Sequence, residues 1–226
     1  YYIESHEQKC SSYIEKMKEF EKKVKLIEVK SPKEWESEIH SVDKVDDNLQ
    51  IVQLANNGSQ FNDVVKALHL TVPSANVTNV FRIENKYLWD KYEREREKIV
   101  LEKGSAKENW LFHGTRSNDP KCLYTVGFDI SFASDQGSLG RGIYFARQAV
   151  YSYHSYVYYK GGKGYLFLAK VITGKSWCSN NRGGGGFVGN NQLRKPPFLD
   201  ESQFIYYDSV TNRNNPRDDH VDQMFV

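Results

Sequence analysis

Apolar residues in the first half of the chain recur mainly with helical spacing. Residues 1–29 carry an apolar side chain every three or four positions among lysines and glutamates, which predicts an amphipathic helix. Residues 60–70 and 85–101 repeat this spacing, and the second of them has the alternating charges of a solvated helix face. Two β-rich segments, 49–54 and 77–83, predict strands.

The pattern changes after Gly104. Short runs rich in aromatic and β-branched residues are separated by Gly, Asn, Asp and Pro, and they cover residues 110–112, 142–146, 165–172, 204–207 and 224–226. Short strands with few long helices between them favour an antiparallel or mixed sheet over a doubly wound parallel one. We therefore predict an α+β protein, with a helical extension or linker at residues 1–29 and the main domain at residues 30–226.

Composition narrows the functional classes only a little. The 226 residues are 39% hydrophobic, enough for a packed core, and a formal net charge of +2 indicates neither a nucleic-acid nor a membrane partner. Cys10, Cys122 and Cys178 suit neither a zinc site nor a disulfide framework, so we expect no metal and a reducing compartment, nucleus or cytoplasm. The polar first residues and the lack of a long apolar run predict neither a signal peptide nor a membrane span.

Three stretches could carry chemistry. The apolar pair Leu111-Phe112 ends in His113-Gly114-Thr115, where a strand would give way to a loop, and a glycine there lets a ligand approach the backbone. Residues 140–146, Gly-Arg-Gly-Ile-Tyr-Phe-Ala, are not a dinucleotide fingerprint, because the third glycine is missing and a strand-like run follows. The tyrosines of residues 147–159 could form an amphipathic surface or stack on a flat heteroaromatic ligand.

Taken together and in this order, the motifs resemble the catalytic domain of the PARP-like (diphtheria-toxin-like) ADP-ribosyltransferases. The resemblance covers residue 30 to the end and is carried by residues 111–115, 140–146, 207–210 and 223–226. Residues 81–85, followed by Leu88, Trp89 and Tyr92, are similar to the branch that transfers single ADP-ribose units. The resemblance implies a split, mostly antiparallel β-sheet, NAD as co-substrate, and a family fold that continues past Val226. The small polar residues of 131–139, between the two motifs, separately predict a mobile flap.

The resemblance also assigns roles around the NAD molecule. His113 would hydrogen-bond the ribose of the adenosine half, Gly114 would clamp the nicotinamide carboxamide through its backbone, and Ser152 would reach the same carboxamide.

Two tyrosines would hold the nicotinamide ring itself. Tyr144 would pack beside it, and Tyr156 would stack on its other face, with Tyr158 as the alternative for this last role. We expect His113 at a strand end and Tyr144 in or beside a neighbouring strand, both facing one cleft.

The third signature position, after His113 and Tyr144, separates chain-building relatives from single-transfer relatives. Chain builders place a glutamate there, which activates the hydroxyl that extends the polymer, whereas Met224 holds that place in residues 223–226. Gln203 and Asp208 are not its equivalents, because residues 207–210 match the family's preceding segment. A thioether cannot act as a base, so we expect single transfer to an acceptor that brings its own carboxylate, on another protein or on this one. Nucleic-acid ends remain open as acceptors.

Two other functions stay open. A non-catalytic module could keep the fold and bind NAD or a partner protein, although the retained His113, Tyr144 and Ser152 argue against a degenerate pocket. A tyrosine-rich interaction domain outside the family is disfavoured by the ordered motifs. The glycine runs at 161–164 and 183–186 are interpreted as loops between strands.

Overall fold

The computed structural model describes residues 2–36, 41–44, 46–134, 137, 139–179, 187–188, 191–211 and 223–225. Its α-helices are α1 (Tyr2–Lys25), α2 (Ser59–His69), α3 (Lys86–Lys103), α4 (Pro120–Val126) and α5 (Ala149–Ser155), and its 3-10 turns are η1 (Lys33–Glu36), η2 (Ile130–Phe132) and η3 (Glu201–Gln203). The strands of the first two thirds are β1 (Ser41–Lys44), β2 (Leu49–Gln53), β3 (Phe81–Asn85), β4 (Glu108–His113), β5 (Tyr144–Ala146), β6 (Tyr158–Lys160) and β7 (Lys163–Tyr165). Those that follow are β8 (Phe167–Ile172), β9 (Ser176–Cys178), β10 (Phe187–Val188), β11 (Asn191–Gln192), β12 (Phe198–Asp200), β13 (Ile205–Tyr206), β14 (Ser209–Thr211) and β15 (Gln223–Phe225).

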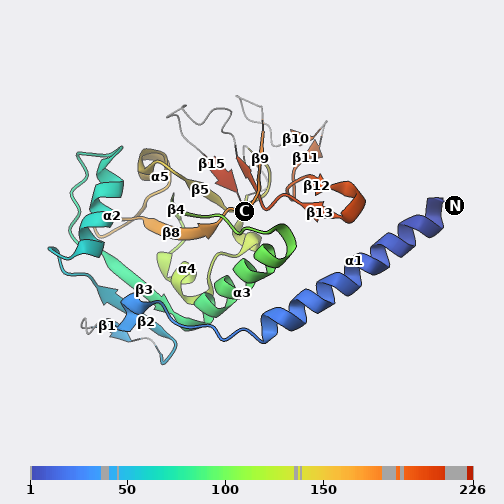
Figure 1. Cartoon of the computed structure of the whole chain (residues 1–226). Coiled ribbons are helices and arrows are strands. Elements are labelled where there is room, and N and C mark those ends of the chain that lie inside the picture. The colour runs from blue at the N-terminus through green and yellow to red at the C-terminus, as the bar shows by residue number, and fades with distance from the viewer. Residues whose placement is uncertain are drawn as a thin grey trace.

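A six-stranded sheet with the order β8-β4-β5-β15-β14-β9 forms the centre of the molecule (Figure 1). Its strand pairs are antiparallel except β14 with β9. β4 pairs with β8 over six residues but meets β5 at the single pair Phe112↔Ala146. The sheet is therefore split between β4 and β5, and the predicted α+β fold with a mostly antiparallel sheet is confirmed.

The core lies on both faces of β4, because successive strand residues point to opposite sides. Leu111 packs with Phe145 and Val171 on one face, while Phe112 packs with Ala149 of α5 on the other. Leu111 is 2% exposed, and truncating such a side chain typically costs about 2–5 kcal/mol of stability. This packing fixes the strand ends next to the split.

A three-stranded antiparallel sheet, β1-β2-β3, stands apart from the central one (Figure 1). Phe61 of α2 packs over its end with Leu54 and Val80. β3 begins at Phe81, later than the predicted 77, because Val77 and Val80 lie in an irregular segment that packs on α2. The predicted strand at 49–54 and the helices at 60–70 and 85–101 agree with β2, α2 and α3 within two residues.

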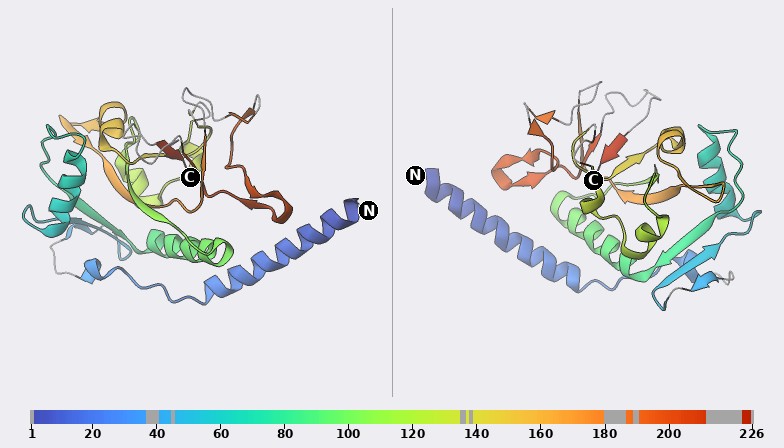
Figure 2. Two further views of the ribbon diagram at one scale, coloured as in Figure 1. Left: turned by 45° about the horizontal axis from the view of Figure 1, so that its top comes forward. Right: turned by 180° about the vertical axis from the view of Figure 1, so that it is seen from behind.

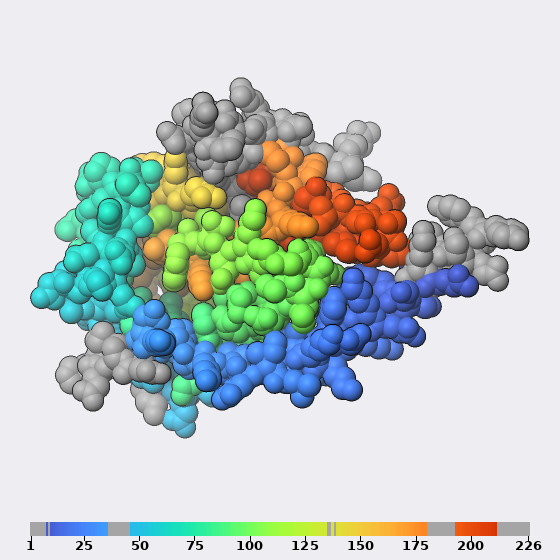
Figure 3. All heavy atoms as spheres, viewed as in Figure 1, coloured from blue at the N-terminus to red at the C-terminus, as the bar shows by residue number. Residues whose placement is uncertain are grey.

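Helix α1 runs along α3 and extends past it toward the segment around β12 and β13 (Figures 2 and 3). Phe20 and Val24 are buried on the side of α1 that faces α3, and Arg94 Nη1 donates to the Val24 carbonyl at 2.7 Å. The predicted helix over 1–29 ends at Lys25. The division of the chain at residue 29 into extension and domain stays a prediction.

Sequence reasoning missed the two short helices α4 and α5, which are seven residues each. The first glycine run contains the tight turn of the β6–β7 hairpin at Gly161-Gly162, both with positive φ. The second run, 183–186, lies outside the described residues, and so do residues 135, 136 and 138 of the expected flap.

Candidate functional site

His113 is the last residue of β4, at the split in the sheet, and its Nδ1 lies 2.7 Å from the Tyr144 carbonyl oxygen at the start of β5. A carbonyl only accepts, so Nδ1 carries the proton and donates, and Nε2 of the neutral ring is left as the acceptor. Burial lowers the pKa of His113, and the Tyr144 carbonyl opposes this effect only in part. The neutral imidazole with an accepting Nε2 is thus the favoured form near neutral pH.

Gly114 packs directly on the end of α5. A Cβ atom at this position would collide with the Tyr156 carbonyl oxygen and would lie 2.8 Å from the Tyr156 Cβ. Arg116 N also donates to the Tyr156 carbonyl at 2.7 Å. The loop after His113 can approach α5 this closely only because residue 114 has no side chain.

Of the two tyrosines considered for the stacking role, Tyr156 contacts Gly114 through its backbone carbonyl and Cβ, and the stacking role itself stays a prediction. Tyr156 lies against Gly114, and its ring and hydroxyl lie 5.3 and 3.2 Å from those of Tyr151. Tyr158 instead belongs to the β6–β7 hairpin and pairs its ring with Tyr165 at 6.1 Å. Ser152, 3% exposed, sits on α5 with its Oγ 3.3 Å from the Phe112 carbonyl, one residue before His113.

Tyr144 turns its side chain away from His113. Its hydroxyl accepts from Leu139 N and donates to the Gly140 carbonyl, both at 2.7 Å, and its ring packs with Leu139, Leu193 and Val210. His113 and Tyr144 are therefore neighbours through the Tyr144 backbone and not ring to ring. That both side chains line one NAD cleft stays a prediction.

Met224 is the middle residue of β15, opposite Phe145 of β5 and Thr211 of β14. Phe145 pairs with Met224 on one side, and its ring lies 5.3 Å from the His113 ring on the other. Phe145 thus lies between position 224 and His113. The backbone at 224 thus occupies a strand next to the site.

Asp208 and Gln203, which the sequence separates from position 224, lie outside β15. Asp208 accepts from Lys103 Nζ and, at 2.8 Å, from Lys175 N, and the Asp208 and Lys103 side chains are 7% and 6% exposed. Gln203 lies exposed in η3. The carboxylate of Asp208 is engaged in holding the start of β14.

The structure adds one residue that the motifs did not contain. Phe128, between α4 and η2, sets its ring nearly perpendicular to that of His113, with the ring centroids 5.0 Å apart. The available signal in the sequence was an aromatic residue directly after Gly127, because a glycine that ends a helix fixes the direction of the residue that follows.

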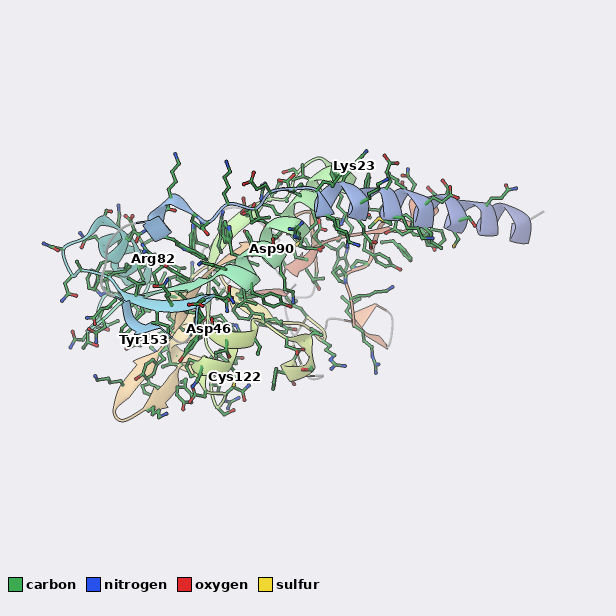
Figure 4. The ribbon with its side chains drawn as sticks, turned by 90° about the horizontal axis from the view of Figure 1, so that it is seen from below. Lys23, Asp46, Arg82, Asp90, Cys122 and Tyr153 are labelled. Atoms are coloured by element: carbon green, nitrogen blue, oxygen red, sulfur yellow. The ribbon has the colours of Figure 1, made fainter. Side chains whose placement is uncertain are left out.

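The described part of the chain holds no group of three or more His, Cys, Asp or Glu side chains that could bind a metal ion. Cys10, Cys122 and Cys178 are not joined in disulfides, and Cys122 is exposed on α4 (Figure 4). Among the described helices, none combines the length and the apolar character needed to cross a membrane.

Comparison with known proteins identifies this arrangement. The family profile described as "Poly(ADP-ribose) polymerase catalytic domain" matches residues 58–181, which include His113, Tyr144 and Ser152. The split sheet and this match define an NAD⁺ ADP-ribosyltransferase fold. The chain belongs to the poly(ADP-ribose) polymerase catalytic domain family.

Individual relatives point to the single-transfer branch. The chain is 38% identical over 112 residues to a probable poly [ADP-ribose] polymerase of Dictyostelium discoideum, covering 46% of this chain and 33% of the relative. It is 29% identical over 165 residues to the protein mono-ADP-ribosyltransferase PARP12 of Mus musculus, covering 71% and 22%. The mouse protein mono-ADP-ribosyltransferase PARP11 is 27% identical over 195 residues, covering 74% and 55%. The chain thus spans between about a fifth and half of these relatives, and its resemblance to the mono-transferring branch is confirmed.

Proposed function

We propose that this protein is an NAD-dependent protein mono-ADP-ribosyltransferase, which transfers one ADP-ribose unit to an acceptor and releases nicotinamide. The observation that carries the proposal is the neutral His113 imidazole, held by the Tyr144 carbonyl so that Nε2 is its acceptor atom. A ribose hydroxyl can donate to that nitrogen. Two of the relatives named above are mono-ADP-ribosyltransferases, which supports the same activity.

The donor NAD would be held by groups on three elements. Nε2 of His113 binds the adenosine ribose, the Gly114 backbone and Ser152 Oγ bind the nicotinamide carboxamide, and Tyr156 stacks on the nicotinamide ring. The contacts of Gly114 with Tyr156 and of Ser152 with the Phe112 carbonyl support this grouping, because they bring α5 to the end of β4. Holding both ends of NAD lowers the barrier through orientation and binding energy.

The chemical step is a substitution at the ribose carbon C1 that carries the nicotinamide. The bond from C1 to the nicotinamide nitrogen breaks with oxocarbenium character, and nicotinamide leaves as a neutral molecule. An acceptor carboxylate oxygen forms the new bond to C1, so no proton has to be removed from it. Met224 offers no base for a hydroxyl acceptor, which favours acidic side chains, on other proteins or on this one.

A second candidate function is a catalytically inactive domain that binds NAD or a protein partner. Met224 in the place of the family's glutamate is the observation that favours it, and the fixed His113 argues against it. A location in the nucleus or cytoplasm is a further part of the proposal, because the three cysteines form no disulfide and suit a reducing compartment. Nucleic-acid ends stay open as acceptors, with no observation in their support.

The deciding experiment combines binding and transfer. The protein is titrated with NAD by calorimetry and then incubated with NAD labelled in its adenylate phosphate, with His113→Ala as the matched control. Binding together with label on protein and released nicotinamide supports the transferase. Binding without transfer would establish an inactive domain that binds NAD. No binding would overturn the transferase and leave only the inactive domain that binds a protein partner.

A further inference from the structure

Three aromatic rings meet at the end of β4. The centroid of the Phe128 ring lies 5.0 Å from that of His113 and 5.0 Å from that of Phe145, and the His113 and Phe145 centroids are 5.3 Å apart. The Phe128 and His113 planes are 88° apart, which is the edge-to-face arrangement that aromatic pairs prefer. The imidazole is thus enclosed by rings from two different segments.

Phe128 is delivered to this place by the end of α4. Gly127 closes the helix with φ +89°, and its N–H donates to the Leu123 carbonyl at 2.9 Å. A Cβ atom at Gly127 would lie 2.9 Å from Leu88 Cδ2 of α3. The backbone that carries Phe128 therefore packs tightly on α3.

A buried asparagine ties α4 to the same helix. Asn85 is 7% exposed; its Oδ1 caps α3 by accepting from Leu88 N at 3.0 Å, and its Nδ2 donates to the carbonyls of Tyr124 and Thr125 at 3.0 and 3.3 Å. Both ends of one amide side chain thus fix the start of α3 and the last turn of α4. The contacts between α3 and α4 therefore fix the backbone at Phe128, which precedes the expected flap at residues 131–139.

We propose that Phe128 is a positioning residue, which holds the His113 imidazole in the orientation where Nδ1 binds the Tyr144 carbonyl and Nε2 serves the NAD donor. One hydrogen bond does not fix an imidazole, because rotation by a half turn exchanges the nitrogen positions for carbons. Rings packed on it from two segments oppose that rotation. This inference rests on the proposed function for its consequence in NAD binding, but the orientation itself can be measured without NAD.

The Tyr144 carbonyl is the polar group that binds the His113 ring, and the rings that pack on it are apolar. From β5 come this carbonyl and the apolar Phe145; β8 contributes Phe167, opposite His113 in the sheet. Asp129, next to Phe128, accepts from Ser131 N at 2.8 Å, and the His113 pKa responds to burial and to the Tyr144 carbonyl. Phe128 is 41% exposed, so its removal opens the imidazole to water without leaving a sealed cavity.

The test compares Phe128→Ala, Phe128→Leu and Phe128→Tyr, with Ile130→Ala as the control. Ile130 is a large apolar side chain two residues further on and is 47% exposed, so it matches Phe128 in segment and exposure. The first readout is the ¹⁵N NMR spectrum of the imidazoles against pH, with the His113 signals assigned through His113→Gln. The second is the Kd for NAD by calorimetry.

The unmodified protein should show a single His113 tautomer, protonated at Nδ1, with a pKa below the ordinary 6.5. In Phe128→Ala and Phe128→Leu the tautomers should mix, the pKa should move toward 6.5, and the Kd for NAD should rise about two- to tenfold. Phe128→Tyr should restore the spectrum and the affinity, and Ile130→Ala should leave both unchanged.

An unchanged His113 spectrum in the alanine and leucine variants would overturn the inference, whether or not the affinity falls. A loss of affinity with an unchanged spectrum would mean that Phe128 acts on the ligand directly. If the protein binds no NAD while its His113 spectrum responds as expected, the positioning role stands and the proposed function fails.

Discussion

The two sides of the split sheet both have apolar cores but differ in their buried polar groups. On the β4 side, His113 is enclosed by aromatic rings and bound by one backbone carbonyl. On the β15-β14-β9 side, where Met224 lies, Val210 of β14 packs with Leu139 and Leu193, and buried polar contacts are added. The pair Lys103–Asp208 anchors the start of β14, and Ser209 Oγ donates to the Thr173 carbonyl at 2.7 Å. On the β4 side, Nε2 of His113 remains as a hydrogen-bond acceptor. On the β14 side, the polar groups just named bind one another or the backbone.

The proposed function divides the work of a chain-building enzyme into two tasks, binding NAD and activating a sugar hydroxyl. In the proposed function, binding and orienting NAD would need His113, Gly114 and α5, and these lie together in the structure. Activating a sugar hydroxyl would need a base at the place that the resemblance assigns to Met224, and methionine is not a base. The following predictions test whether the donor side is complete and whether the other side serves only as scaffold, from the largest expected effect to the smallest.

Product length is the most direct test of the Met224 side. General-base assistance is typically worth about 10²–10⁴-fold in rate, so a second transfer onto an attached ribose should be slower than the first by about this factor. Labelled product, detached from protein and run on a sequencing gel, should show single ADP-ribose units. Met224→Glu need not restore polymers, because the acceptor side must also recognise a growing chain. A ladder from the unmodified protein would contradict single transfer and leave the fold assignment intact.

The polar support of β14 should appear as stability. Lys103→Met leaves the Asp208 carboxylate buried without its ammonium partner, and such a loss typically costs about 3–5 kcal/mol of unfolding free energy. Urea unfolding followed by circular dichroism measures it. The matched control is Lys23→Met, which breaks an exposed pair with Glu19 and should leave the unfolding midpoint nearly unchanged. Equal effects in both variants would show that the buried pair is no anchor.

His113→Ala should weaken NAD binding without destabilising the fold. A ligand hydroxyl that loses its acceptor typically costs about 1–3 kcal/mol, so the Kd for NAD should rise about 5- to 150-fold. The unfolding midpoint should stay close to that of the unmodified protein. His154→Ala, an exposed histidine on α5, is the control and should bind NAD normally. Unchanged binding in His113→Ala would remove this residue from the site.

Local periodicity was sufficient to predict α1, β2, α2 and α3 in the first half and the α+β class, but it did not predict β1. It could not predict α4 and α5, because seven residues span only two turns and give too few apolar repeats to detect. β14 pairs in parallel with β9 and antiparallel with β15, and such long-range pairing is not encoded in any local pattern.

The sequence predicted which residues belong to the candidate site, but not how their side chains are arranged. The motifs indicated His113 and Tyr144 as neighbours, but not that they would meet through the Tyr144 carbonyl while its hydroxyl binds residues 139 and 140. Whether Tyr156 or Tyr158 lies beside Gly114 depends on where α5 ends, which the sequence left open by two residues. Phe128 was missed because its role arises only when α4 packs on α3.

The smallest expected effect is the pH dependence of the donor side. Burial lowers the pKa of His113 below 6.5, so the folded protein takes up this proton less readily than the unfolded chain. The contribution of His113 to stability is therefore fully present above about pH 6.5 and is lost as the pH falls toward the folded pKa, by at most about 1.4 kcal/mol per pH unit. The affinity for NAD should change at a lower pH than the stability, because it depends on the folded-state pKa of His113 alone. It should be constant from pH 8 to 6.5 and should fall once Nε2 of the folded protein is protonated and can no longer accept a hydrogen bond. Calorimetric titrations across this range, with His113→Gln as a variant that lacks this titration, measure it. An affinity that already falls above pH 6.5 in the unmodified protein, but not in His113→Gln, would mean that the imidazole is charged in the folded state and that the aromatic enclosure does not keep it neutral.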